Sequence, residues 1–190
     1  MKCYQCGNED ERYFAYDKGV YYCRKCVAFG RMDAYVRKES CHLSTRVIEV
    51  SPQLKYELTD KQKAISHKIV EYLKQKKDVF VYAATGAGKT ESVFECICFY
   101  LSQGKKVGFA ISRRQVVLEI AQRLRQAFPT LHVVEVTQGY TTITDGDIIV
   151  CTMHQLYRYP DGFDLLIMDE VDAFPYVEND VLQTITKKSL

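Results

Sequence analysis

A glycine-rich loop between an apolar run and a helical run constrains this 190-residue chain more than any other feature. Residues 79–82 are apolar and lead into the sequence AATGAGKT over residues 83–90. This stretch matches GxxxxGK[ST] with Ala83 at the first position, and a helix is expected over residues 91–101. Gly86 and Gly88 permit the tight turn that directs backbone N–H groups at phosphates. The chain is therefore expected to bind phosphate at a strand-to-helix junction.

Short apolar runs alternate with helical periodicity from about residue 55 onward. The runs mostly lack polar alternation, as strands buried on both faces do. We expect strands over residues 79–83, 107–111, 131–136, 147–151 and 164–168. Apolar stripes at helical spacing lie before the first run, over residues 65–73, and between the second and third, over residues 116–128. This order predicts an α/β fold, a parallel sheet with helices on both faces.

Two adjacent acids follow the last of these apolar runs, in the sequence DEVD over residues 169–172. Acids at a strand end are usually only solvated, but beside a phosphate loop they indicate Mg²⁺-nucleotide chemistry. Asp169 would hold Mg²⁺ through water, and Glu170 would polarise the attacking water as general base. Lys89 would reach the β- and γ-phosphates, and the Thr90 hydroxyl would bind Mg²⁺. Lys89, Asp169 and Glu170 are thus the expected catalytic residues.

The N-terminal segment carries two CxxC pairs that are sixteen residues apart, Cys3 with Cys6 and Cys23 with Cys26. This spacing is typical of a zinc ribbon, in which four thiolates surround one Zn²⁺ and leave no open position for a reacting water. Two disulfides or free thiols are the alternatives, and a reducing compartment disfavours the disulfides. The other four cysteines are expected to be ordinary residues: Cys41, Cys96, Cys98 and Cys151.

Composition changes near Ser51 and Pro52, which predicts a four-cysteine zinc-binding module over residues 1–50 and an ATPase lobe over residues 51–190. The 26 Lys and Arg residues nearly balance the 24 Asp and Glu residues, so any nucleic-acid contact must come from local patches. No apolar run is long enough for a membrane span, and the start has no signal-peptide core. A cytoplasmic protein is therefore expected.

The loop and the DEVD sequence together resemble the first, RecA-like motor lobe of superfamily 2 helicases, over about residues 56–175. The sequence LTDKQ over residues 58–62 resembles the family's Q-type motif, which implies that Gln62 binds the adenine edge and that Tyr56 stacks near it. Thr59 and Gln62 also fit a helix capping box. The expected nucleotide-binding residues are Tyr56, Gln62, Thr85, Gly86, Ala87, Gly88, Lys89, Thr90 and Asp169.

Three further segments resemble the nucleic-acid motifs of the same superfamily: SRRQ over residues 112–115, TQG over 137–139 and TMHQL over 152–156. Each follows a predicted strand, at the edge where α/β sheets bind ligands. For the first segment, ordinary arginines exposed to solvent are an equally good interpretation. The residues that the resemblance implies for nucleic-acid contact are Arg113, Arg114, Gly139, Thr152 and His154.

A four-cysteine module directly before a DEVD-box lobe is similar to the ComFA-type DNA-uptake ATPases of naturally competent bacteria. That resemblance implies an ATP-driven motor acting on single-stranded DNA, with other competence proteins at the membrane channel as partners. It also implies a place at the inner face of the membrane, without a membrane span, and an oligomer in the full-length protein. The alternatives are a helicase-like subunit in repair, restriction or replication restart, or a non-catalytic fragment that docks a partner.

Motors of this superfamily have a second lobe that supplies a catalytic arginine, and a Ser-Ala-Thr strand between the phosphate-loop strand and the DEVD strand. Both are expected past residue 190, so the chain is expected to be a truncated piece with a gap in its sheet. It is then expected to bind nucleotide with negligible hydrolysis. In the zinc module, the cations Arg24 and Lys25 accompany four tyrosines that serve either as base-stacking groups or as a small core: Tyr4, Tyr13, Tyr21 and Tyr22.

Overall fold

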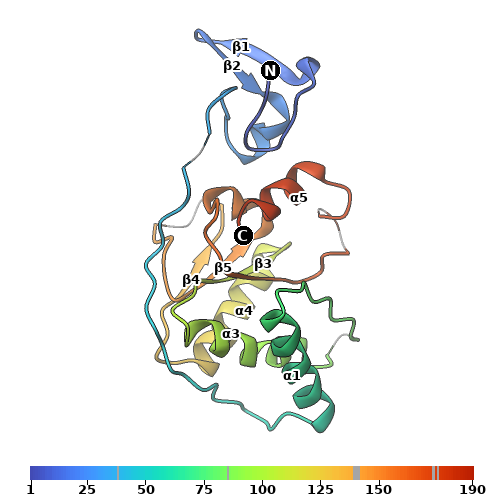
Figure 1. Ribbon diagram of the computed structural model, residues 1–190, viewed down its shortest axis with the longest axis vertical. Helices are drawn as coiled ribbons and strands as arrows, with labels where there is room; N and C mark the ends of the chain where they lie inside the picture. Colours follow the sequence, from blue (N-terminus) through green and yellow to red (C-terminus); the bar gives the residue numbers. More distant parts are fainter. Residues whose placement is uncertain (38, 85, 139–141, 173, 175) are drawn as a thin grey trace.

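A computed structural model of the chain shows a small N-terminal module set at one end of an α/β lobe (Figure 1). The structure describes residues 1–37, 39–84, 86–138, 142–172, 174 and 176–190. Two expected site residues, Thr85 and Gly139, lie outside the described residues. No helix in the described ranges has both the length and the apolar character to cross a bilayer.

The lobe is built on a four-stranded parallel sheet in the order β4-β5-β3-β6. Its strands are β3 (Val107–Ile111), β4 (Val133–Val136), β5 (Ile148–Thr152) and β6 (Leu165–Met168). All residues of the two central strands, β3 and β5, are buried, as their unbroken apolar sequences predict. The parallel sheet expected from the sequence is thus confirmed for these four runs.

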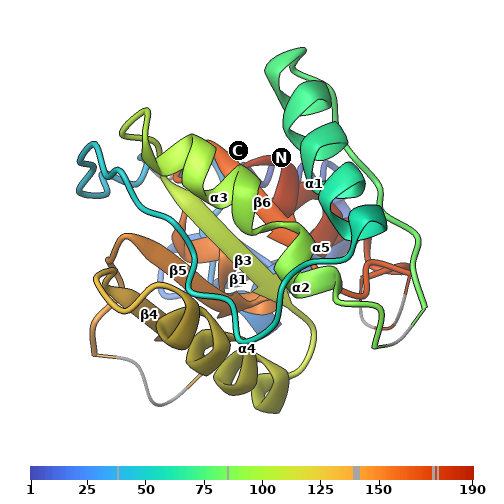
Figure 2. The same cartoon turned by 90° about the horizontal axis from the view of Figure 1, so that it is seen from below.

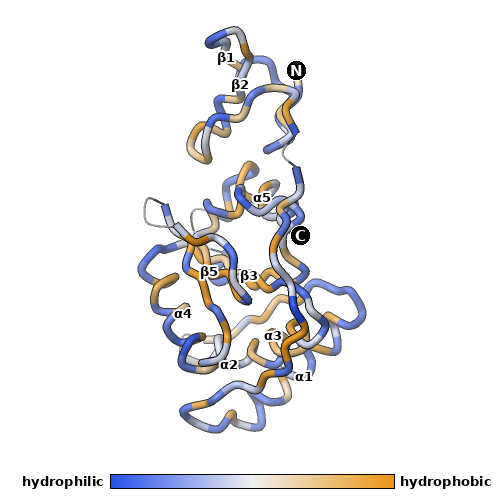
Figure 3. Tube along the Cα trace, turned by 90° about the vertical axis from the view of Figure 1, so that its left-hand side faces the viewer, coloured by the Kyte–Doolittle hydropathy of each residue, from blue (hydrophilic) through white to orange (hydrophobic). Residues whose placement is uncertain are grey.

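Helices cover both faces of this sheet, as expected. One face carries α1 (Asp60–Lys74), α3 (Phe94–Leu101) and α4 (Arg114–Ala127), while the other carries the 3-10 helix η3 (Met153–Arg158) and α5 (Asp180–Lys187). Alternation along β3 sends Phe109 to the first face and Ala110 to the second. Figure 2 shows α3 and α4 lying over the strands, and Figure 3 shows the hydrophobic colour along β5.

The strand expected over residues 79–83 is wrong, because this segment forms no strand. Phe80 and Tyr82 are 70% and 91% exposed. β6 pairs with β3 on one side, and no described strand pairs with its other side, which residues 79–83 leave open. The helix expected over 91–101 is also divided, into α2 (Lys89–Ser92) and α3, with the break at Val93.

The N-terminal module is an antiparallel hairpin with a short helix on each side. It consists of η1 (Glu11–Tyr13), β1 (Phe14–Asp17), β2 (Val20–Cys23) and η2 (Arg24–Phe29). Phe29, at the end of η2, is 5% exposed and packs in the same cluster as Leu182 and Ile185 of α5. Val181 of α5 also packs against the module's cysteine cluster, and Lys188 donates to Tyr4 O, so several contacts join the module to the lobe.

Residues 40–54 form a strap that leads from the module along the lobe. Backbone hydrogen bonds fix it at three points, from Cys41 N to Pro160 O (2.7 Å), from Ile48 N to Leu101 O (3.0 Å) and from Gln53 N to Ala127 O (2.7 Å). Figure 2 shows the strap crossing the face that α3 and α4 cover. These backbone hydrogen bonds attach the strap to the lobe and add to those within its four-stranded sheet.

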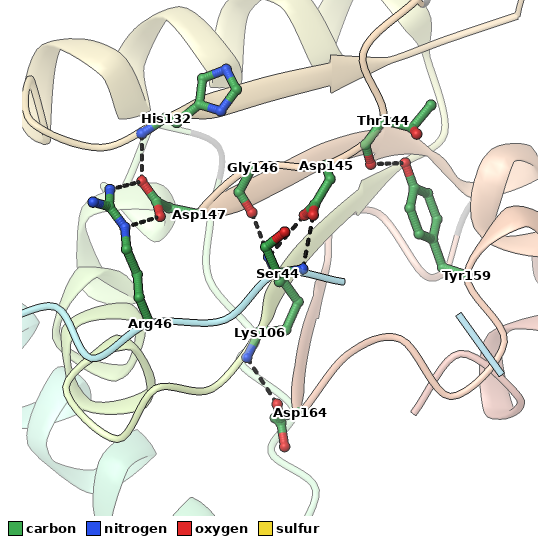
Figure 4. A network of polar contacts seen from close by, with 10 residues as sticks. All are labelled: Ser44, Arg46, Lys106, His132, Thr144, Asp145, Gly146, Asp147, Tyr159 and Asp164. Atoms are coloured by element: carbon green, nitrogen blue, oxygen red, sulfur yellow. Dashed lines mark hydrogen bonds and ion pairs between the residues drawn. The ribbon is translucent and has the colours of Figure 1, made fainter. Parts of the chain in front are cut away.

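Charged side chains hold the same strap to the loop before β5 (Figure 4). Arg46 donates from Nε and Nη2 to the two carboxylate oxygens of Asp147, at 2.8 and 2.7 Å. Ser44 N donates to Asp145 at 2.8 Å, and the buried Lys106 Nζ donates to the other Asp145 oxygen at 3.0 Å and to Gly146 O at 2.6 Å. Burial alone would raise the pKa of Asp145, but these hydrogen bonds lower it.

Replacing the buried ammonium in Lys106→Met is expected to lower the free energy of unfolding by about 2–3 kcal/mol. Asp145 would lose its cationic partner, and the estimate is kept low because that side chain is 33% exposed. Thermal unfolding should then shift down by about 5–10 °C. The neighbouring variant Lys105→Met should change stability by less than about 0.5 kcal/mol. Equal effects from the two variants would contradict a stabilising role for the network.

Candidate nucleotide site and zinc centre

The glycine-rich loop adopts the turn that its sequence predicts. Gly86 and Gly88 both have left-handed backbone angles, with φ of 80° and 77°. The positive φ favours glycine at position 88, and a Cβ there would lie 2.2 Å from Nε2 of Gln62 and displace that amide group. Lys89 follows directly as the first residue of α2, and its side chain is exposed. The loop therefore places Lys89 at the start of α2, with its side chain exposed to solvent.

Gln62 is held on both sides of its amide group. Its Oε1 accepts from Thr59 N at 2.8 Å and completes the capping box at the start of α1, so the capping interpretation is confirmed. Its Nε2 donates to Ala87 O at 2.9 Å. Gln62 thus ties the start of α1 to the phosphate loop. That Gln62 binds the adenine edge stays a prediction.

A hollow of about 390 Å³ opens between the strap, α1 and α3. Leu54, Leu58 and Phe94 give it an apolar floor, while Glu91 and Glu95 make one side acidic. Neither Gln62 nor the exposed Tyr56 lines it. The hollow therefore gives no support to an adenine site at those two residues.

The other predicted magnesium ligand on the loop, Thr90, lies beside α4. Arg123 donates to Glu91 at 2.6 Å and reaches the Thr90 hydroxyl at 3.5 Å. This ion pair connects α2 to α4 across the helical face of the sheet. Sequence reasoning missed Arg123, since thirty residues of sequence separate it from its partners and its only sequence signal is an arginine on an otherwise expected helix.

The acid pair follows β6 as predicted. Asp169 N donates to Ala110 O at 3.1 Å, which extends the pairing of β6 with β3 by one residue. Glu170 has a left-handed backbone angle, with φ of 55°, and its N–H donates to the Asp169 carboxylate at 3.1 Å. Asp169 is half-buried and Glu170 is exposed. Both carboxylates lie at the carboxyl edge of the sheet, where α/β folds bind ligands.

In the structure, the phosphate loop and the acid pair are not linked to each other. No hydrogen bond or ion pair connects the described loop residues with Asp169 or Glu170. The separation has a structural reason, because residues 79–83 are outside the sheet and so do not position the loop at its carboxyl edge. The turn at Gly86 and Gly88 and the acid pair after β6 have the predicted backbone, whereas the strand expected before the turn is absent.

The described residues of the predicted nucleic-acid segments gather at this same carboxyl edge. Arg113 caps the start of α4 after β3, and it is exposed like Arg114. Thr152 ends β5 and is 8% exposed. His154 follows in η3 and is half-buried. Neighbouring parallel strands bring the ends of β3 and β5 together, so Arg113 is exposed at this edge while Thr152 is largely covered.

His154 is covered by the zinc module. Its ring stacks on Phe29 with centroids 5.3 Å apart and an angle of 18° between planes. Burial lowers the pKa of His154, which favours the neutral ring in this contact. No local pattern indicates that Phe29, three residues after Cys26, contacts the lobe. A nucleic-acid role for His154 stays a prediction.

Four cysteine sulfurs come together in the module. All four Sγ atoms lie within 4.8 Å of one another, and the Cys3–Cys26 and Cys6–Cys23 pairs are each 3.7 Å apart. A disulfide requires about 2.05 Å. A tetrahedron with Zn–S bonds of about 2.3 Å has sulfurs about 3.8 Å apart. The geometry fits a four-thiolate zinc centre.

Hydrogen bonding favours a thiolate in the cluster. The Cys26 and Cys6 thiols, with the backbone N–H groups of Cys6 and Gln5, lower the pKa of Cys3 to about 2. The same hydrogen bond raises the pKa of Cys26. Gly7, with φ of 74°, makes the turn after the first cysteine pair. The pKa of Cys6 is raised as well, so without a metal ion the hydrogen bonds favour one thiolate among the cysteines. Four cysteine sulfurs are the donor set of a structural zinc site, and this donor type agrees with the geometry.

A parallel α/β lobe with a phosphate loop and a strand-end acid pair defines a helicase-like ATPase lobe. Comparison with protein families agrees, since the chain belongs to the family described as type III restriction enzyme, res subunit, whose model matches residues 55–188.

Two curated relatives match most of the chain. It is 35% identical over 200 residues, 99% of this chain, to "Competence protein ComFA" of Bacillus subtilis (strain 168). It is 35% identical over 180 residues, 90% of this chain, to "Competence protein ComFA" of Streptococcus pneumoniae (strain ATCC BAA-255 / R6). The chain spans 42% and 40% of the lengths of these two proteins.

Proposed function

We propose that this chain is the ATP-binding motor lobe, with its zinc module, of a helicase-like ATPase that acts on single-stranded DNA during natural transformation. The observation that carries the proposal is a single chain that combines a phosphate loop, a strand-end acid pair and a four-thiolate cluster. Similarity to two competence proteins over at least 90% of the chain supports the competence context. The proposed organisation is a zinc module over residues 1–50 and the ATPase lobe over residues 51–190.

Each site residue has a proposed role. Lys89 contacts the β- and γ-phosphates, and the backbone N–H groups of Gly86, Ala87 and Gly88 surround them. Thr90 and Asp169 are the residues that would hold Mg²⁺, which supplies charge neutralisation to the phosphates. Glu170 accepts the proton of the attacking water.

Bringing these groups together requires movement of the loop. The exposed Lys89 and the exposed segment around Phe80 and Tyr82 are free of sheet pairing. We propose that residues 79–83 join the sheet in the nucleotide-bound protein and carry the loop toward Asp169. A cytoplasmic location, peripheral to the membrane, and contacts with other competence proteins belong to the same proposal.

Turnover by this chain alone is expected to be negligible. In related P-loop enzymes an arginine from another lobe or protein contributes about 10³–10⁵ in rate. ATP hydrolysis should therefore stay near background with and without single-stranded DNA, while nucleotide still binds. DNA-stimulated turnover that Lys89→Ala abolishes would contradict the expected need for an arginine from another lobe or protein.

The family description favours one second candidate, a nucleic-acid motor subunit of a restriction system. That candidate shares the nucleotide chemistry and differs in its biological substrate. Loss of transformation on deletion of the gene supports the first proposal, and loss of phage restriction supports the second.

A further inference from the structure

We infer that the zinc module carries its own binding site for single-stranded nucleic acid, in a hollow formed by η1 and η2. The hollow measures about 380 Å³ and is lined by Arg12, Tyr13, Arg24 and Lys25. The inference rests on the proposed function, because it extends the DNA contacts of the motor to a second surface. The site is separate from the nucleotide loop and from the arginines at the start of α4.

The hairpin and the four-cysteine cluster position the residues that line this hollow. Tyr13 immediately precedes β1 and Arg24 immediately follows β2, so both lie at the end of the hairpin opposite its turn. Lys25 lies between Cys23 and Cys26, two of the cluster residues, and its Nζ is 4.2 Å from the centroid of the Tyr13 ring. The fold thus places an aromatic ring and three cations around one concave surface.

Among the described residues, two of the cationic side chains at the hollow form no ion pair with an acidic side chain. The nearby acids are already paired, Glu9 with Lys2 at 2.9 Å, Glu11 with the N-terminus at 3.9 Å and Asp10 with Arg12 at 2.7 Å. Arg24 and Lys25 are exposed, and within the described part of the chain neither forms an ion pair. The hollow therefore carries a local positive charge that the near-neutral composition conceals.

This combination matches single-stranded nucleic acid better than a protein partner. Cations that follow a backbone and an aromatic ring that stacks on a base are the two components of sequence-tolerant single-strand binding. Protein-docking surfaces are enriched in arginine and tyrosine but depleted of lysine. Here Lys25 lines the hollow, and among the described residues Tyr13 is the only aromatic side chain that does so.

A competing explanation assigns the cations to the metal centre. Four thiolates around Zn²⁺ carry a net charge of −2, and Lys25 and Arg24 could serve only to neutralise it. The two explanations differ in what a neutral substitution changes. Screening predicts easier zinc loss with unchanged DNA affinity, whereas a binding site predicts weaker DNA binding with zinc retained.

The test uses the full chain loaded with zinc and a labelled oligothymidylate, with affinity measured by fluorescence anisotropy across salt concentrations. The double variant Arg24→Gln/Lys25→Gln should lower the slope of log affinity against log salt by about 1.4, at about 0.7 per phosphate contact. Tyr13→Ala should weaken binding about tenfold or more. Lys18→Gln, at the hairpin turn away from the hollow, is the matched control and should bind as the unchanged chain does.

Zinc content and Mg²⁺-nucleotide affinity are measured on the same samples. Weaker DNA binding with normal zinc and normal nucleotide affinity supports the inference. DNA affinity that depends on Arg113→Gln but not on the hollow variants overturns the inference and leaves the proposed function standing. Absence of DNA binding by the unchanged chain also overturns the inference, whereas failure of the proposed function appears separately, as absence of nucleotide binding.

Discussion

Removing zinc from the full chain, by chelation or by Cys23→Ser, is expected to unfold the N-terminal module while the lobe stays folded. The buried apolar cluster of the module consists of three cysteines and Met32, which is too little to stabilise it without metal. Structural zinc contributes about 10–16 kcal/mol of apparent binding free energy in small zinc-dependent folds. The strap has its own hydrogen bonds to the lobe, so unfolding should stop before residue 40.

Hydrogen exchange measured by mass spectrometry gives the readout. Peptides from β1 and β2 should lose protection, whereas peptides from β3 and β5 should keep it. Cys41→Ser removes a cysteine outside the cluster and should retain one zinc per chain and normal protection. Loss of protection in both regions together, in one cooperative step, would contradict an independently unfolding module.

The second large effect is expected at the phosphate loop. Lys89→Ala should weaken Mg²⁺-nucleotide binding by at least about 100-fold, because the lost ammonium makes charge-assisted contacts to two phosphates. Folding should be unaffected, since Lys89 is exposed and within the described residues it has no ion pair. The variant therefore separates nucleotide chemistry from stability.

Titration calorimetry with a non-hydrolysed ATP analogue measures this loss. Lys68→Ala, an exposed lysine on α1, is the matched control and should bind as the unchanged chain does. Equal affinity of Lys89→Ala and the unchanged chain would show that the nucleotide binds elsewhere.

Local sequence pattern predicts the central part of this fold well and its edges poorly. β3 and β5 are predictable because a strand buried on both faces must be apolar throughout. Residues 79–83 are similarly apolar, yet they pair with no described strand although one edge of β6 is unpaired within the described sheet. Composition reports what a segment can bury, whereas pairing depends on which strand lies beside it.

The candidate site was likewise predictable in one part and not in another. The cysteine cluster follows from its spacing, since each CxxC pair places two sulfurs on one side of an ion. The Gln62–Ala87 hydrogen bond, the Arg46–Asp147 ion pair and the Phe29–His154 stack join residues 25, 101 and 125 positions apart, and no local pattern indicates them. These long-range contacts are what connect the module, strap and loop to the lobe.

The central claim is that the phosphate loop and the acid pair form one metal-nucleotide site, and paramagnetic broadening tests it most directly. Mn²⁺ replaces Mg²⁺ with a non-hydrolysed ATP analogue, and the backbone amide signals of the isotopically labelled chain are recorded. We predict strong broadening at Gly86, Gly88 and Lys89 together with Asp169 and Glu170. Broadening at only one of these two segments, or at neither, would contradict the claim.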